Sequence, residues 1–335
     1  MNRFHLVWLN CSLTEPYTPI FEIIYTFEIF LIICFILLSP FACYAFWKAA
    51  PLHQNIRLLF SATVLHGFLG AAARLVLIYQ QLADDNNTDA SISRLTAASV
   101  AREICFGYMM ILLCFLSSER AVATYAWAWY ESQADSTLAV FVVELAVAEM
   151  YSLTTAFFAV YEIYSMNTHV MVFAVTLSLG ALCFFKLLAH NRRELQRLKG
   201  RQDNLGYCIS RSYQIRENLA VFKIFRHLAV PCCAMAVPAF VFFIAYWWIP
   251  AGAGWNTTRL VCIAFYDMWL AMYDMMLLVM FISSDDKFQK SLRVFRLFDR
   301  LFDLLQPSVI PRPETATREQ ESNVYFSLLS KDLKL

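Results

Sequence analysis

The chain has 335 residues, of which 59% are hydrophobic and 16% charged, and its mean hydropathy is +0.52. Soluble globular proteins contain about 45–50% apolar and about 25% charged residues, so this composition indicates a membrane protein. The formal net charge of +1 leaves no excess of cationic side chains, which gives no reason to expect a nucleic-acid partner.

Seven segments are long and apolar enough to cross a bilayer as helices. A hydrocarbon core about 30 Å thick needs about 20 residues at about 1.5 Å per residue. The segments cover residues 23–47, 58–81, 97–122, 137–161, 168–189, 222–249 and 259–282. We therefore expect an all-α membrane protein, with seven transmembrane helices in a single domain over residues 23–284.

Two signals predict that the N-terminus, residues 1–22, is extracellular and the C-terminus cytosolic. With that orientation, 22 of the 27 Lys and Arg residues lie on the cytosolic side, as the positive-inside rule requires. Three N-glycosylation sequons, at Asn10, Asn86 and Asn256, then all lie outside. We expect these three asparagines to be glycosylation sites.

The residues after the seventh segment divide into two parts. Over residues 285–306, apolar and basic side chains occupy different faces of a helix, which predicts an amphipathic helix on the inner leaflet. The apolar face has Phe288, Leu292, Phe295, Leu301, Phe302 and Leu305, and the basic residues are Lys290, Arg293, Arg296 and Arg300. Residues 307–335 are polar and predict a disordered cytosolic tail.

Several ionisable residues fall at membrane depth, where a charge that faces lipid costs about 2.5 kcal/mol or more. Glu28, Arg74, Glu103 and Asp267 lie within about 15 Å of the outer ends of their segments. Their segments adjoin in a seven-helix bundle, so we expect Arg74 to pair with Asp267 or Glu28. A direct contact with a ligand is the alternative.

Two acids of the fourth segment, Glu144 and Glu149, have no cation near them in sequence. We expect at least one of them to be protonated and hydrogen-bonded inside the bundle. Asp274 lies deeper in the seventh segment. We assign Glu149 and Asp274 to the same polar network or ligand pocket as the four residues above.

A charged pair, Glu119-Arg120, ends the uncharged run Ile104 to Ser118 and precedes several aromatic residues. A start near Ala97 places Arg120 about 35 Å along the helix, at the cytosolic face. From the residues alone, the pair marks either an ordinary helix end, followed by an interfacial aromatic belt, or a functional site.

Two stretches resemble a known family. Residues 119–131, ERAVATYAWAWYE, and 211–219, RSYQIRENL, are similar to the patterns E-R-x-x-A-T-x-x-x-x-x-Y-E and R-Y-Q-x-x-E-N of nematode serpentine chemoreceptors of class epsilon, Sre. Ser212 is inserted in the second. The matching residues are Glu119, Arg120, Ala123, Thr124, Tyr130 and Glu131, followed by Arg211, Tyr213, Gln214, Glu217 and Asn218.

The resemblance implies a G-protein-coupled receptor of the plasma membrane, in sensory-neuron cilia. It would bind a small-molecule ligand outside and activate a heterotrimeric G protein inside, using the matching residues as a switch. Arg120 would pair with Glu119 in the inactive state and be released when the sixth helix moves outward. No cofactor is implied, and the resemblance leaves open whether the receptor forms an oligomer.

The chain departs from the wider receptor family at two places. The seventh segment has no Asn-Pro-x-x-Tyr sequence, and the loop at 164–169 contains no Cys. Cys105 is either free or paired with Cys11.

Other functions have less support. The six histidines form no HxxxH or HExxH set, and neither a phosphate-binding Gly-rich loop nor GxSxG occurs, so we do not expect an enzyme. A ligand-gated channel with its N-terminus inside would place the sequons in the cytosol. A proton-coupled transporter would use the buried acids, but we find no pair of broken helices.

Overall fold

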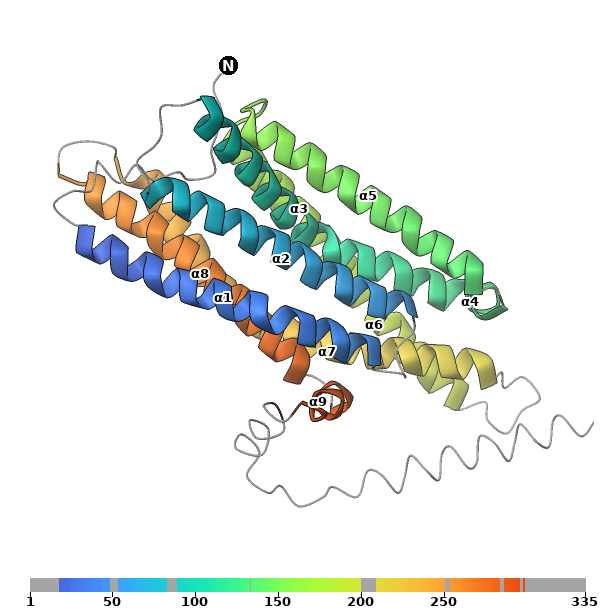
Figure 1. Cartoon of the computed structure of the whole chain (residues 1–335). Helices are drawn as coiled ribbons and strands as arrows, with labels where there is room; N and C mark the ends of the chain where they lie inside the picture. The colour runs from blue at the N-terminus through green and yellow to red at the C-terminus, as the bar shows by residue number, and fades with distance from the viewer. Residues whose placement is uncertain are drawn as a thin grey trace, which may run out of the picture. The chain divides into compact units, whose positions relative to one another are not determined.

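The computed structural model describes residues 18–48, 54–82, 89–132, 134–199, 209–250, 254–283, 286–295 and 298. Within these residues the chain is built of helices and turns, without a strand (Figure 1). The chain divides into two compact units, Met1–Phe288 and Gln289–Leu335, and the fold described below is that of the first.

Each predicted transmembrane segment lies, to within one residue, inside one long helix. The two helices next to residues 200–208 extend beyond their predicted segments, as the polar sequence there indicates. The helices are α1 (Thr18–Lys48), α2 (Gln54–Leu82), α3 (Asp89–Tyr125), α4 (Trp127–Ser132), α5 (Ala134–Val160), α6 (Met166–Lys199), α7 (Ile209–Trp248), α8 (Asn256–Ser283) and α9 (Asp286–Leu292).

Six helices, α1, α2, α3, α5, α6 and α8, are long and apolar enough to cross a membrane. The chain is thus an all-α protein of the membrane-spanning kind. Within the described residues, the apolar stretch of α7 is Val237–Trp248, which is shorter than a membrane span. Most side chains in the preceding turns of α7 are not among the described residues. The crossing of the membrane by α7, and the side of the membrane on which each terminus lies, stay predictions.

The outward faces of α5 and α6 are apolar. Their large side chains recur every three or four residues and so form one stripe along each helix. A continuous exposed apolar surface of this kind is stable against lipid but not in water. The stripe of α5 includes Val143, Val147, Met150 and Phe157, and that of α6 includes Met171, Val175, Leu179 and Leu182.

α3 packs closely against α5 and α6 because glycines remove the side chain at the contact points. A Cβ atom added to Gly107 in α3 would lie 2.9 Å from the Cα atom of Ser152 in α5. A Cβ atom on Gly180 in α6 would lie 2.9 Å from the backbone nitrogen of Cys114 in α3. Small residues at helix contacts allow this close approach of backbones within a bilayer.

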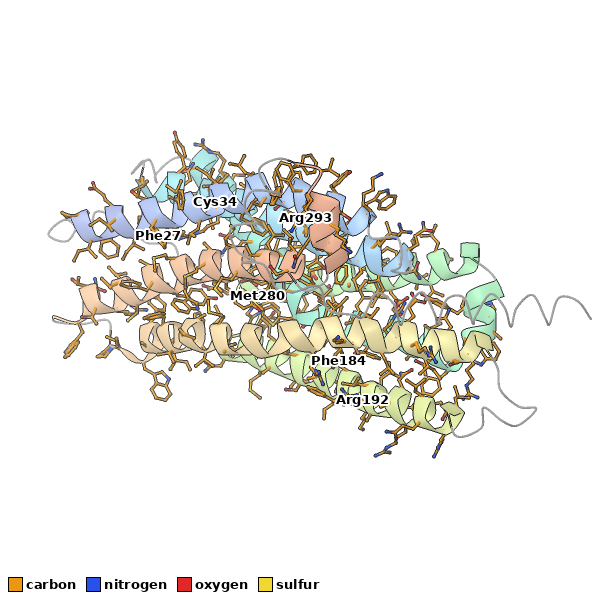
Figure 2. The ribbon with its side chains drawn as sticks, turned by 90° about the horizontal axis from the view of Figure 1, so that it is seen from below. Phe27, Cys34, Phe184, Arg192, Met280 and Arg293 are labelled. Carbon is orange, nitrogen blue, oxygen red and sulfur yellow. The ribbon has the colours of Figure 1, made fainter. Side chains whose placement is uncertain are left out.

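Aromatic rings fill the end of the bundle at which α1 terminates. Phe46, Phe60 and Phe281 bring α1, α2 and α8 together, with ring centroids 5.0–6.0 Å apart. Phe288, at the start of α9, packs edge-on against Phe46 at 5.2 Å. Elsewhere Phe184 lies between α6 and α7 (Figure 2) and contacts a phenylalanine of α7, with centroids 5.0 Å apart.

The terminal predictions are described only in part. α9, Asp286–Leu292, covers the start of the amphipathic helix expected over 285–306, and most of the remaining residues of that range lie outside the described residues. The segment 1–22, which is predicted to be extracellular, is described from residue 18 onward, as the beginning of α1. The tail over 307–335 lies outside the described residues.

Candidate coupling and ligand sites

The charged pair at the end of α3 lies inside the bundle and not at its surface. Arg120 is fully buried, and Glu119 is 2% exposed. The Nε atom of Arg120 donates to Oε2 of Glu119, and Nη2 donates to Oε1 over 2.5 Å. Two parallel hydrogen bonds of this kind fix both the distance and the orientation of a guanidinium and a carboxylate. The alternative of an ordinary helix end exposed to the headgroups does not fit this burial.

The short helix α4 supplies a third member of the cluster. The hydroxyl of Tyr130 donates to Oε1 of Glu119 over 2.5 Å and accepts from Nη2 of Arg120 over 3.0 Å. Burial raises the pKa of this phenol, so Tyr130 stays a neutral donor at physiological pH. From α2, the Nδ2 atom of Asn55 lies 3.5 Å from the same hydroxyl.

Asn218 connects the cluster to α7. Its Oδ1 accepts from Nη1 of Arg120 over 2.9 Å, and its Nδ2 donates to the hydroxyl of Thr124 over 2.9 Å. The Nδ2 atom of Asn191 in α6 donates to the same hydroxyl over 3.1 Å. Five helices therefore meet in one set of hydrogen bonds, which we call the Arg120 network. Its members are Asn55, Glu119, Arg120, Thr124, Tyr130, Asn191 and Asn218.

The structure describes only part of the remaining residues of the two stretches. Gln214 is buried, and its amide oxygen has no hydrogen-bond partner among the described residues. Glu217 is half-buried, and its carboxylate has a favourable electrostatic interaction with the guanidinium of Arg120. Glu131 and Tyr213 belong to α4 and α7, but their side chains lie outside the described residues.

Sequence reasoning did not find Asn55 and Asn191. Asn55 precedes the predicted segment 58–81, and Asn191 follows the segment 168–189. Both are almost fully enclosed, with 2% and 0% exposure. A search for amides just beyond the membrane ends, at the level of Arg120, would have detected them.

A second charged cluster joins α1, α2, α3 and α8. Arg74 donates through Nε and Nη2 to the two carboxylate oxygens of Glu28, over 2.5 and 2.9 Å. Its Nη2 also lies 3.0 Å from Oδ2 of Asp267. The other oxygen of Asp267 accepts from Nη2 of Arg102 over 2.5 Å. We call Glu28, Arg74, Arg102 and Asp267 the Arg74 network. Arg74 thus contacts both carboxylates expected as its partners, and Arg102 is a member that the sequence reasoning missed.

Glu103 does not join this network. Its Oε2 lies 3.1 Å from Nε2 of His169 in α6, and the Nδ1 atom of that ring lies 2.7 Å from the hydroxyl of Tyr164. The side chain of Glu103 faces α6, although the sequence groups Glu103 with Glu28, Arg74 and Asp267 as a possible polar network or ligand pocket. Burial, with a contribution from Glu103, raises the pKa of Tyr164 to about 12, so its hydroxyl stays neutral.

Glu149 also has a histidine partner. The Nε2 atom of His66 in α2 lies 2.7 Å from Oε1 of Glu149. The Nδ1 atom of His66 lies 2.8 Å from the carbonyl oxygen of Ala62, which can only accept, so Nδ1 carries a hydrogen. The ring of His66 stacks on Tyr108 at 3.7 Å. The absence of a cation near Glu149 in sequence therefore did not mean the absence of a partner in space.

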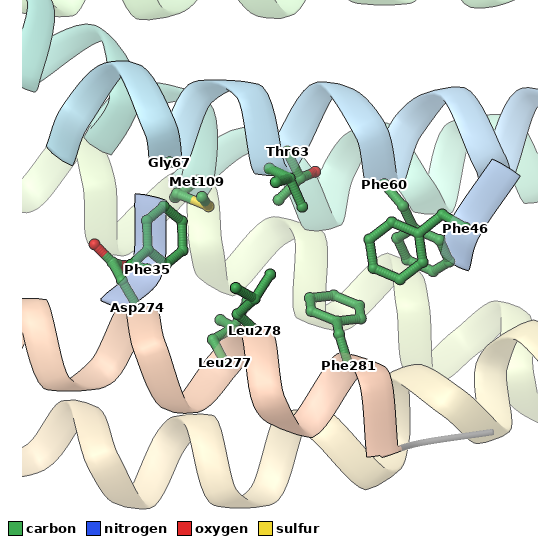
Figure 3. Close-up of a pocket in the computed structure, with 11 residues that line it drawn as sticks. Phe35, Phe46, Phe60, Thr63, Gly67, Met109, Asp274, Leu277, Leu278 and Phe281 are labelled. Atoms are coloured by element: carbon green, nitrogen blue, oxygen red, sulfur yellow. The ribbon is translucent and has the colours of Figure 1, made fainter. Parts of the chain in front are cut away.

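Asp274 lines two small cavities between α1, α2, α3 and α8. One, of about 20 Å³, is bounded mainly by aromatic and aliphatic side chains. Figure 3 shows Asp274 beside Phe35 at one end of it and the rings of Phe46, Phe60 and Phe281 toward the other. The second, of about 50 Å³, touches all four members of the Arg74 network and is called the Arg74 cavity.

Some predicted features can be located only in part. Asn256 is the first residue of α8 and is half-buried, while Asn10 and Asn86 lie outside the described residues. Cys105 is a free thiol that donates to the carbonyl oxygen of His66 over 3.0 Å. Among the described residues no group of three His, Cys, Asp or Glu side chains is arranged to hold a metal ion.

Comparison with known proteins agrees with the resemblance of the two stretches. The model of the family described as Sre G protein-coupled chemoreceptor matches residues 1–333. The chain belongs to the Sre family. A curated relative, serpentine receptor class epsilon-8 of Caenorhabditis elegans, is 20% identical over 339 residues, covering 95% of this chain and 93% of the relative. This Sre protein is therefore a multi-pass membrane protein of a chemoreceptor family, with the helical architecture of G-protein-coupled receptors.

Proposed function

We propose that this Sre protein is a sensory receptor that binds a small extracellular ligand and activates a heterotrimeric G protein. One observation supports the proposal above the others: the fully buried Arg120 is hydrogen-bonded to Glu119, Tyr130 and Asn218, on three different helices. A buried cation that contacts several movable elements suits a two-state switch, because separating the elements removes several bonds together.

In this proposal, the arrangement of the Arg120 network described above is the closed arrangement of the switch. α7 is held to α3 by the contact of Asn218 with Arg120 and Thr124. If α7 moves away from α3, Arg120 loses one acceptor and a cavity opens beside it. A G-protein segment that supplies a carbonyl or carboxylate to the free guanidinium would stabilise the open arrangement.

We place the N-terminus outside the cell and the Arg120 network at the cytosolic face of the plasma membrane, in sensory-neuron cilia. The distribution of Lys and Arg and the three sequons support this orientation. Exposed cations on α6 and α7, including Arg192, Arg193 and Arg216, lie beside the network and would face the G protein and anionic lipids.

The test measures nucleotide exchange on a panel of purified heterotrimeric G proteins, mixed with membranes that contain the full chain. Tyr130→Phe removes the hydroxyl that bridges Glu119 and Arg120 but keeps the ring. We expect basal exchange to rise several-fold, because the closed arrangement loses the hydrogen bonds of this hydroxyl to Glu119, Arg120 and Asn55. Arg120→Ala should abolish the exchange in the receptor that reaches the surface, and its surface level is measured beside the exchange because Glu119 is left without its partner.

Tyr125→Phe is the matched control, since Tyr125 is 67% exposed at the end of α3 and takes no part in the network. It should behave as the unaltered chain. If no G protein of the panel responds to any surface-delivered variant, the coupling proposal is wrong.

A further inference from the structure

Two buried guanidinium groups each keep one nitrogen without an acceptor. Nη1 of Arg74 and Nη1 of Arg102 have no hydrogen-bond partner among the described residues, and both residues are 4% exposed. Buried donors in native proteins are nearly always paired with protein, water or ligand. Both residues line the Arg74 cavity, so an occupant of that cavity is the nearest source of acceptors.

The charges of the Arg74 network are already balanced. The order of contacts is Glu28, Arg74, Asp267, Arg102, so each cation touches a carboxylate and the central carboxylate is shared by both cations. The two unpaired guanidinium nitrogens therefore require hydrogen-bond acceptors and no counter-charge. A further full charge of either sign would stay uncompensated in a buried site.

The other walls of the cavity agree with a neutral occupant. Asp274 also lines the cavity, and the charges of the walls stay balanced with Asp274 as an uncharged acid; a cation would then meet the two arginines, and an anion would meet the oxygens of Asp274. Phe106 and Met109 of α3 and Leu270 of α8 make up part of an apolar side. A volume of about 50 Å³ accommodates about four water-sized groups at about 10–15 Å³ each.

We propose that the Arg74 cavity binds a small neutral molecule with a hydrogen-bond acceptor and a short carbon chain, such as a ketone or an ester. The oxygen accepts from Nη1 of Arg102 or Arg74, and the carbon chain contacts Phe106, Met109 and Leu270. Ligand pockets commonly have this mixture of apolar walls and a few convergent polar groups. The inference rests on the proposed function, because it names the chemical class of ligand that the receptor detects.

The test compares three four-carbon probes on the purified full chain in detergent: butan-2-one, butanoate and butylammonium. The readout is the midpoint of thermal unfolding, which rises when a ligand binds the folded state only. We expect butan-2-one to raise the midpoint by about 2 °C or more at saturating concentration, and the two charged probes to have at most a third of that effect.

Two variants locate the binding. Ala271→Leu adds bulk at a residue that lines the cavity, and Arg102→Lys keeps the positive charge beside Asp267 but removes Nη1. Both should abolish the shift caused by butan-2-one. Val279→Leu, on the same helix at a site 44% exposed, adds bulk away from the cavity and should keep the full shift.

Four outcomes would overturn the inference. The first is a larger shift with butanoate, which would indicate an anion site, and the second is a larger shift with butylammonium. The third is an undiminished shift in Ala271→Leu, which would place the probe elsewhere. The fourth is no shift with any probe, which would mean that water alone satisfies the arginines. The assay contains no G protein, so these outcomes leave the coupling proposal standing, and a failure of nucleotide exchange leaves this inference standing.

Discussion

The Nη1 atom of Arg120 in α3 lies 2.9 Å from the Oδ1 atom of Asn218 in α7. This contact joins the two stretches on which the family resemblance rests, although 98 positions separate the residues in the chain. Hydrogen bonds from a charged group to a neutral acceptor contribute about 1.5–3 kcal/mol when buried. The contact is thus strong enough to bias an equilibrium between two helix arrangements.

The first prediction concerns Asn218→Ala. It removes the acceptor of Arg120 and the donor to Thr124 without changing a charge. If the closed arrangement loses about 1.5 kcal/mol, the ratio of open to closed receptor rises about tenfold. Basal nucleotide exchange in membranes measures this ratio. Val237→Ala, at a 58% exposed position of the same helix, is the control; equal basal activity in the two variants would contradict the proposed role of Asn218.

The second prediction concerns the pair of Glu28 and Arg74. Glu28→Gln leaves Arg74 with one carboxylate, that of Asp267, which Arg102 already uses. Breaking a buried ion pair from one side costs about 3–5 kcal/mol, so we expect loss of surface delivery. The control Glu22→Gln alters an exposed carboxylate in the same helix and should have no effect.

A double variant separates charge balance from the fold itself. Glu28→Met together with Arg74→Met leaves Asp267 and Arg102 as one balanced pair. Since replacing a whole buried ion pair by apolar side chains is often neutral, surface delivery should largely return. If the double variant reaches the surface no better than Glu28→Gln, then Glu28 and Arg74 contribute more to the fold than the neutralisation of each other's charge.

These contacts show what the sequence could and could not reveal. Hydropathy predicts the helices well, because the bilayer imposes the same length on each segment. The choice of partner depends on helix rotation, which hydropathy does not report. Arg102 and Glu103 are adjacent, yet neighbouring residues of a helix point about 100° apart, so one meets α8 and the other α6.

Histidines are the partners of two acids whose contacts the sequence did not predict. The sequence places no cation near Glu149, yet Glu149 meets His66 from another helix, and Glu103 likewise meets His169. The Arg120 network was easier to anticipate, since four of its members occur within twelve residues, but the amides from α2 and α6 are separate in sequence.

The third prediction concerns the contact of Glu103, His169 and Tyr164, which ties α3 to the turn between α5 and α6. Tyr164→Phe removes the hydroxyl beside the imidazole, and also its bond to a backbone carbonyl of α5. We expect a loss of about 1–3 kcal/mol, seen as a lower thermal midpoint in detergent. Tyr161→Phe, in the same turn, is the control and should leave the midpoint unchanged.

The fourth prediction concerns the packing of α3 on α5. In Gly107→Ala the new methyl group meets the Cα atom of Ser152, so two backbones must separate. We expect a loss of about 1–3 kcal/mol or failure to fold. Gly70→Ala is the comparison, because the nearest atom to its new methyl group, the Cβ atom of Cys105, is 3.2 Å away and so leaves more room than the 2.9 Å at Gly107. If Gly70→Ala is the more damaging change, the close approach at Gly107 is not what limits packing.

The last prediction tests the orientation on which the assignment of the two sides depends. If the N-terminus is outside, Asn10, Asn86 and Asn256 face the lumen during synthesis and can carry glycans. Glycosidase treatment of the expressed chain should then increase its electrophoretic mobility, and Asn10→Gln should remove one step of that change. A chain insensitive to glycosidase at all three sites would remove one of the two signals for this orientation and favour the inverted topology, in which the Arg120 network faces outward.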